Sequence, residues 1–290
     1  MLLAILAVEG VLRINLTRLS RNAAHIATIP LKVERLGNAS GRRILLVGNS
    51  QLRHGVDVAA VTSGLERLGH PVTCEALHPH GTSIQEWEAL IRARILPSPN
   101  RPDLLVLLGT ASHLCAPNYT TYQLEQVGAD YTRPRDVPLL LGRLKNVDEG
   151  GALLMGSLSV AYSSRRATRR RVLTATVPYY PEATVWINRL ALRRLSTPSR
   201  DPDCTLLRAL LRQCQDKDLQ VLIVLTPMRD DPDYQIPSSM LKILKEFHVE
   251  LYDAREKHFE AEDFLDGTHL NERGRVRFTE ALVKRLALVR

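Results

Sequence analysis

Asp266 and His269 lie three positions apart in the segment Asp-Gly-Thr-His near the end of the chain. That spacing is about one turn of the chain, so the carboxylate can reach the Nδ1–H of the imidazole. Such a hydrogen bond fixes the tautomer of the ring and leaves Nε2 free to accept a proton from a nucleophile. The pair therefore predicts a general base that is oriented by a carboxylate.

A hydroxyl that this base could activate lies far upstream, at Ser50. The apolar run 44–47 leads into Gly48-Asn49-Ser50. A strand that ends in a tight turn is how α/β hydrolytic folds present an attacking oxygen. Ser50, His269 and Asp266 are the residue types needed for acyl transfer through a serine ester.

The segments that must position these residues alternate between strands and helices. Apolar runs predict strands at 44–47, 72–77, 103–109, 219–227 and 249–253, with helical patterns between them. Strands that are apolar throughout are typical of a parallel sheet covered on both faces. We therefore predict an α/β fold: a flavodoxin-like, doubly wound sheet of five parallel strands in three layers.

The chain is expected to divide into two parts. Residues 1–40 predict an N-terminal apolar helix and a linker, and residues 41–290 predict the catalytic domain. Within that domain, residues 117–200 interrupt the alternation and predict a helical insertion between the third and fourth strands. Its expected elements are a loop at 117–138 and helices at 139–148, 152–172 and 182–195.

Functional groups of such a sheet gather at the carboxyl ends of its strands. Ser50, Gly81, residues 109–113 and the Asp266/His269 pair all follow predicted strands. At these positions the chain resembles the SGNH, or GDSL-type, hydrolase family, over about residues 43–115 and 218–288. The resemblance is carried by Gly48, Asn49, Ser50, Gly81, Asp266, His269, Asn271 and Gly274.

The resemblance implies Ser50 as nucleophile, His269 as general base and then acid, and Asp266 as the residue that orients His269. It also implies an oxyanion hole formed by the backbone N–H groups of Ser50 and Gly81. The chain departs from the family at Asn49, where the family has Asp, and at Ala111, where the family has an asparagine that donates to the oxyanion.

The departure at Ala111 leaves three outcomes open. Ser112 or His113 could supply a substitute donor, the enzyme could work slowly with two backbone donors, or the domain could only bind. Removing one oxyanion donor typically costs about 10²- to 10³-fold in rate. No metal or organic cofactor is needed for the expected chemistry.

The composition limits the partners. A net charge of +8 suits anionic partners, and with only 5% aromatic residues no basic stretch is interleaved with aromatic side chains, which argues against nucleic acid. The four cysteines, at 74, 115, 204 and 214, have no metal-ligand spacing, and buried free thiols are the favoured interpretation. Free thiols fit a reducing compartment.

The apolar N-terminus, residues 1–8, has two interpretations. It is either an amphipathic helix packed on the domain or the end of a membrane anchor; alone it is too short to span a bilayer. The first leaves a cytoplasmic location open, and the second predicts a membrane-anchored or extracytoplasmic protein.

The leading functional hypothesis is a serine esterase or acyltransferase acting on a small acyl ester, with carbohydrate O-acyl groups suggested by family analogy alone. An anionic polysaccharide would suit the charge. The alternative is a catalytically weak or inactive domain that binds glycan or serves as a subunit of an envelope acylation complex.

Overall fold

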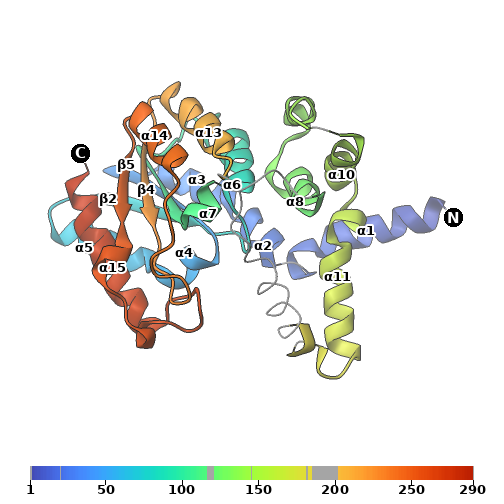
Figure 1. Cartoon of the computed structure of the whole chain (residues 1–290). Helices are drawn as coiled ribbons and strands as arrows, with labels where there is room; N and C mark the ends of the chain where they lie inside the picture. The colour runs from blue at the N-terminus through green and yellow to red at the C-terminus, as the bar shows by residue number, and fades with distance from the viewer. Residues whose placement is uncertain are drawn as a thin grey trace.

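The computed structural model describes residues 2–19, 21–115, 121–144, 146–180, 182–184 and 202–289. Its centre is a parallel sheet of five strands in the order β2-β1-β3-β4-β5 (Figure 1). The strands are β1 Arg42–Val47, β2 Val72–Leu77, β3 Leu104–Gly109, β4 Gln220–Leu225 and β5 Glu250–Asp253. The predicted doubly wound α/β fold is confirmed, because all five strands form and their order is the flavodoxin-like one.

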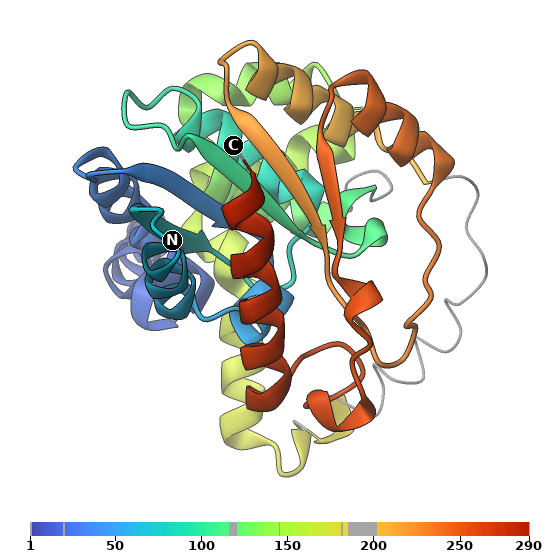
Figure 2. The same ribbon diagram turned by 90° about the vertical axis from the view of Figure 1, so that its left-hand side faces the viewer.

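The sheet forms the middle of three layers because its side chains alternate between two apolar cores. Leu45, Val47 and Leu105 face one core, and Ile44, Leu46 and Val106 face the other. The first core is covered by α3 Ile29–Gly37, α6 Ile84–Leu90, α13 Thr205–Gln215 and α14 Ser238–Glu246. The second is covered by α4 Ser50–Gly55, α5 Val58–Arg67 and α15 Glu272–Leu288 (Figure 2).

The remaining described elements are two N-terminal helices, the helices of the insertion and short helical turns. They are α1 Leu2–Leu19, α2 Arg21–Ala27, η1 Ile91–Ile95, α7 Ala111–Leu114, α8 Thr121–Gln126, η2 Val127–Tyr131, η3 Pro134–Asp136, α9 Val137–Leu141, α10 Val147–Leu158, α11 Val160–Thr176, η4 Ala254–Lys257 and η5 Ala261–Asp263. Residues 21–37, which were expected to belong mostly to a linker, are thus helical, and Ile29 and Leu36 are buried in the core.

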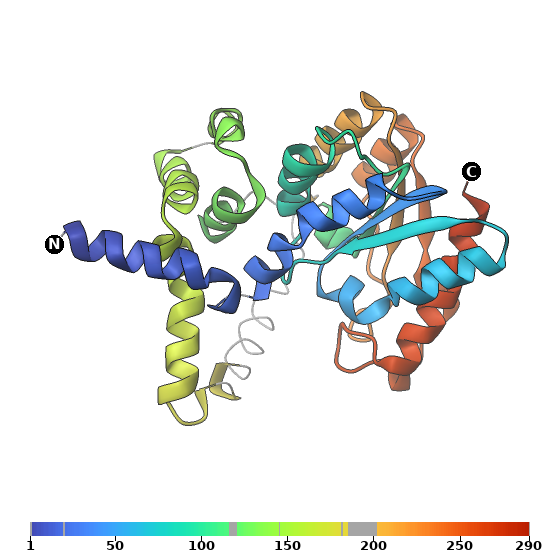
Figure 3. The ribbon, with the colours of Figure 1, turned by 180° about the vertical axis from the view of Figure 1, so that it is seen from behind.

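The insertion lies to one side of the sheet, and its helices differ from those expected (Figures 1 and 3). The expected loop 117–138 contains α8 and a π-helical turn, η2. Two glycines let α10 approach this segment: a Cβ on Gly156 would lie 2.3 Å from the carbonyl oxygen of Glu125, and one on Gly128 would lie 2.3 Å from that of Leu153. The close approach of the two segments therefore requires glycine at both positions.

The helix expected at 152–172 is interrupted at Ser159, where α10 ends and α11 begins. The hydroxyl of Ser159 accepts a hydrogen bond from the backbone N–H of Tyr162 at 3.1 Å and so caps α11. The expected helix 182–195 lies outside the described residues except for 182–184.

The N-terminal helix α1 packs across the start of α11 through Glu9. Its carboxylate accepts hydrogen bonds from the backbone N–H groups of Val160, at 2.7 Å, and Ala161, at 3.0 Å. Burial acts to raise the pKa of Glu9, but these hydrogen bonds outweigh it and lower the pKa to about 2. Among the described residues, no helix is both long and apolar enough to cross a membrane.

The prediction of four free thiols is wrong. Cys115, directly after α7, and Cys204, directly before α13, form a disulfide across 89 residues of chain, with their Cα atoms 4.3 Å apart. Cys74 and Cys214 are free and buried. Sequence spacing could not reveal the bond, because the insertion separates the two cysteines along the chain while its two ends meet in space.

Candidate active site

Ser50 is held at the start of α4, directly after β1, by two local constraints. A Cβ on Gly48 would lie 2.9 Å from the carbonyl oxygen of Leu108, so only glycine lets this turn approach β3. The side chain of Asn49 accepts a hydrogen bond from the backbone N–H of Gln51 at 2.9 Å and caps the helix. The Asn found where the SGNH family has Asp therefore fills the capping role with an amide oxygen.

The structure brings Ser50, His269 and Asp266 together from opposite ends of the chain. Nε2 of His269 lies 2.9 Å from Oγ of Ser50, and Nδ1 of His269 lies 2.8 Å from Oδ2 of Asp266. Both distances are within hydrogen-bonding range. The imidazole thus joins a hydroxyl on one side to a carboxylate on the other, in the order that proton transfer from the serine requires.

The carboxylate of Asp266 is fixed by the backbone as well as by the imidazole. Its Oδ1 accepts hydrogen bonds from the N–H groups of Thr268 and His269, both at 2.8 Å. Burial acts to raise the pKa of Asp266, but the His269 ring and these N–H groups lower it to about 2. Asp266 is therefore ionised at neutral pH, and its charge can stabilise a protonated imidazole at His269.

Glycines let the loop that carries Asp266 and His269 pack closely on its neighbours. A Cβ on Gly267 would overlap the carboxylate of Asp230, and one on Gly274 would lie 2.2 Å from the carbonyl oxygen of Asp263. The backbone N–H groups of Arg229 and Asp230 donate to the carbonyl oxygen of Gly267, at 3.0 and 3.1 Å. The segment after β4 thus braces the loop from behind.

Gln51 is a positioning residue that the sequence did not indicate. Its buried side chain accepts a hydrogen bond from the hydroxyl of Thr226, at the end of β4, at 2.9 Å, and donates to the carbonyl oxygen of Thr268 at 3.4 Å. It therefore links the residue next to the nucleophile to the loop that carries the base. No motif marks such a glutamine, because its role depends on contacts between distant segments.

His54, four residues after Ser50, packs against the imidazole of the candidate site. Its ring is tilted against that of His269, with the centroids 4.9 Å apart. Burial lowers the pKa of His54, and the nearby His269 and Arg53 lower it further. The lowered pKa favours the neutral form of the His54 ring, which packs against one side of the His269 imidazole.

Gly81 lies in the turn after β2, with a positive φ of 68° that favours glycine. The side-chain amide of Asn49 donates to the carbonyl oxygen of Thr82 at 3.1 Å and ties this turn to the nucleophile turn. The hydroxyl of Thr82 in turn accepts from the indole N–H of Trp87 at 2.9 Å. One side-chain hydrogen bond, from Asn49 to Thr82, therefore joins the two turns that supply the candidate backbone donors.

The third turn of the site, after β3, carries no side-chain amide. Ala111 is buried at the start of α7. The hydroxyl of Ser112 is 2.8 Å from Oγ1 of Thr110, which also lies 2.8 Å from Nδ1 of His113. Burial lowers the pKa of His113 to about 4, so its ring is neutral at pH 7. His113 is thus bound to the helix cap, whereas Ser112 is exposed and its hydroxyl can rotate.

The side chains of the candidate site are partly exposed, at 21% for His269 and 52% for Asp266. Two cavities, of about 460 and 650 Å³, lie elsewhere, and neither is lined by Ser50, His269 or Asp266. In the described parts of the chain, no group of three or more His, Cys, Asp or Glu side chains is placed to hold a metal ion.

No family model matches the chain, and no curated protein sequence matches it. Among solved structures, it is similar to a variant of Axe2, an acetylxylan esterase from Geobacillus stearothermophilus, at 10% identity over 86% of this chain and 95% of that one, with a TM-score of 0.43. It is also similar to AlinE4, an SGNH-hydrolase family esterase, at 12% identity over 86% of this chain and 96% of that one, with a TM-score of 0.38. Alignments this weak do not decide the chemistry of the site, which rests on its own geometry.

Proposed function

We propose that the protein is a serine esterase or acyltransferase that cleaves or transfers a small acyl ester. The observation that carries this proposal is the continuous chain of contacts from Ser50 through His269 to Asp266, at 2.9 and 2.8 Å. A hydroxyl, an imidazole and an ionised carboxylate in that order are the groups that activate a serine for attack on a carbonyl carbon.

In the proposed reaction, Oγ of Ser50 attacks the ester carbonyl carbon while its proton passes to Nε2 of His269. The carbonyl oxygen becomes an oxyanion, to which the backbone N–H groups of Ser50 and Gly81 would donate. His269 then protonates the leaving alcohol as the carbonyl re-forms, which leaves an acyl ester on Ser50. Water or a second hydroxyl, deprotonated by His269, attacks that ester. As the bond between the acyl carbon and Oγ breaks, His269 returns the proton to Oγ of Ser50.

Ala111 supplies no donor in this scheme, and we assign the third donor to the hydroxyl of Ser112. Ser112 is one residue further along the same turn, and it is exposed. If its hydroxyl turns from Thr110 to the oxyanion, Ser112→Ala lowers kcat by about 10²- to 10³-fold, with little change in KM. A variant with wild-type kcat would mean that two backbone donors serve alone.

The proposed substrate is an O-acyl group, such as acetate, on a carbohydrate, a choice that rests on the resemblance to the SGNH family. An anionic polysaccharide would suit the net charge of +8. We further propose an extracytoplasmic location. The Cys115–Cys204 disulfide supports it, because such bonds persist mainly in oxidising compartments.

Turnover of p-nitrophenyl acetate by the wild type and by Ser50→Ala tests the proposal. We expect the wild type to release p-nitrophenol and the variant to lose at least 10³-fold of that rate. Gln213→Ala, which removes a side chain that binds Glu88 and not the triad, controls for general effects of substitution.

A second candidate is a domain that binds acylated glycan without turning it over. The absence of an amide at Ala111 is the observation in its favour. Equal release of p-nitrophenol by the wild type and by Ser50→Ala, together with binding of acetylated xylan by both, would select it over the esterase.

A further inference from the structure

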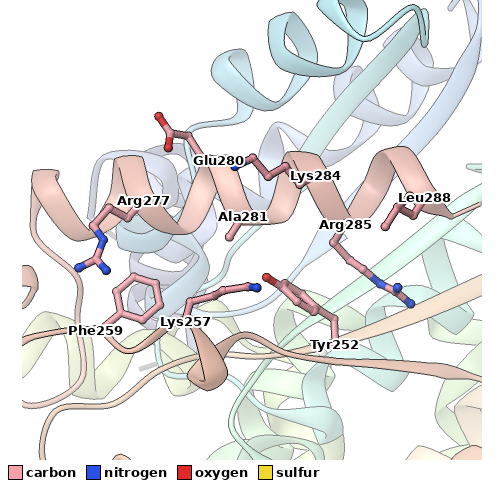
Figure 4. A pocket seen from close by; sticks show the side chains of 9 residues that line it. All are labelled: Tyr252, Lys257, Phe259, Arg277, Glu280, Ala281, Lys284, Arg285 and Leu288. Atoms are coloured by element: carbon pink, nitrogen blue, oxygen red, sulfur yellow. The ribbon is translucent and has the colours of Figure 1, made fainter.

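A groove of about 460 Å³ lies between α15 and the segment that contains the edge strand β5 and the turn after it (Figure 4). Four of its nine lining residues carry a positive charge at neutral pH, namely Lys257, Arg277, Lys284 and Arg285, and one, Glu280, carries a negative charge. None of the lining residues belongs to the candidate active site.

The helix side of the groove has room at its centre. Arg277, Ala281 and Arg285 lie four residues apart on α15 and therefore share one face of the helix. The methyl group of Ala281 is short, so it leaves space between the two long arginine side chains. Figure 4 shows Glu280 and Lys284 on the far side of the helix from Lys257 and Tyr252.

The strand side of the groove offers two hydrogen-bond donors. The ends of the Lys257 and Tyr252 side chains point toward each other below α15 (Figure 4). The phenolic oxygen of Tyr252 is shielded from solvent yet has no hydrogen-bond partner. Among the residues that the structure describes, no ion pair is formed by Lys257. A buried polar atom without a partner is costly, so this end of the groove is suited to a polar ligand.

The two arginines make the groove positive although each is already paired. Arg277 pairs with Asp263 and also donates to the carbonyl oxygen of His258 at 3.2 Å, and Arg285 pairs with Glu250. Nε of Arg285 is shielded from solvent and has no partner. The pairs hold the guanidinium groups in place and leave N–H donors for a further acceptor.

We propose that this groove binds the oxyanion group, phosphate or carboxylate, of a small anionic ligand such as an acidic sugar. The ammonium group of Lys257 donates to its oxygens. The side chains of Tyr252 and Arg285 turn toward the ligand on binding, so that the hydroxyl and Nε–H, which are shielded without it, also donate. Charged donors of this kind bind phosphate and carboxylate groups strongly. The cavity is within the usual size range of small-molecule sites, about 300 to 1,000 Å³.

Titration calorimetry of the full chain at constant ionic strength tests this site with three probes: inorganic phosphate, glucose 6-phosphate and glucuronate. We expect saturable binding of at least one probe. If only inorganic phosphate and glucose 6-phosphate bind, the site is specific for phosphate groups. If glucuronate binds, the site also accepts carboxylate groups.

Two variants test the location by different means. Lys257→Gln removes a charged donor and should weaken binding about 10- to 100-fold. Ala281→Leu fills the space between the arginines without changing the charge and should weaken binding at least as much. Lys242→Gln, which removes an exposed charge on α14, is the matched control and should bind within two-fold of the wild type.

Circular dichroism and p-nitrophenyl acetate turnover of each variant show whether the fold and the separate active site are intact. The proposal is refuted if no probe binds saturably, or if Lys257→Gln and Ala281→Leu bind as the wild type does. Equal weakening by Lys242→Gln would also refute it, since only the overall charge would then matter.

Discussion

Asp266→Asn tests the orientation of the general base without disturbing the turn. In the wild type, Oδ1 of Asp266 accepts hydrogen bonds from the N–H groups of Thr268 and His269, both at 2.8 Å. The amide oxygen of the new side chain can accept the same two hydrogen bonds. Its NH₂ group then faces Nδ1 of His269, where Oδ2 now lies at 2.8 Å. Because an NH₂ group only donates, Nδ1 must become the acceptor, and the ring proton moves to Nε2.

A proton on Nε2 faces the hydroxyl of Ser50, 2.9 Å away, so His269 can no longer accept the serine proton. The wrong tautomer in such a triad typically costs about 10³- to 10⁴-fold in kcat, equivalent to about 4 to 5.5 kcal/mol in the barrier. The free energy of unfolding should change little, because the turn keeps its backbone hydrogen bonds.

Steady-state turnover of p-nitrophenyl acetate at pH 7.5 measures this effect. Asp230→Asn is the matched control, because Asp230 packs on the same loop at Gly267 but makes no hydrogen bond to His269. We expect the control to stay within three-fold of the wild type. Turnover by Asp266→Asn within ten-fold of the wild type would refute the tautomer argument.

Three further predictions concern stability. The disulfide across 89 residues restricts the unfolded chain and should raise the free energy of unfolding by about 4 to 5 kcal/mol, so its reduction should lower the melting temperature. Thiol titration of denatured, unreduced protein should find two free thiols, and a count of four would contradict the bond. Glu9→Gln should lower the free energy of unfolding by about 1 to 2 kcal/mol and speed proteolysis of α1, because the N–H groups at the start of α11 lose the negative charge that they bind. An unchanged cleavage rate would show that other contacts hold α1. Burial lowers the pKa of His25 to about 3 and that of His78 to about 4, so the unfolded chain binds more protons than the fold below pH 6.5. Stability should therefore be complete above pH 6.5 and fall as the pH drops toward 3, and unfolding curves that do not change over this range would contradict the assignment.

The sheet could be predicted from the sequence because its strands carry their own signals. β3 is apolar at every position, and β1 leads directly from an apolar run into a tight turn. The contacts among Ser50, His269 and Asp266 followed from this, since the carboxyl ends of parallel strands meet at one edge. That expectation needed only the order of the elements and the positions of three residues.

The parts that sequence reasoning missed depend on contacts between distant segments. The Cys115–Cys204 bond needs the two ends of the insertion to meet, and Gln51 acts through Thr226 and Thr268. The break at Ser159 has a local signal, a serine that caps the next helix, but the apolar pattern on both sides concealed it. Helix α8 was missed because tyrosines and prolines nearby are typical of loops.

The most direct measurement of the central claim is the mass of the intact protein after rapid mixing with p-nitrophenyl acetate and acid quenching. An acyl intermediate adds one acetyl group, about 42 Da, to the chain by the stoichiometry of serine ester formation. We predict that the wild type gains this mass, that peptide mapping places it on Ser50, and that Ser50→Ala gains none. Turnover with no acetylated Ser50, or equal acetylation of Ser50→Ala, would contradict the proposed mechanism.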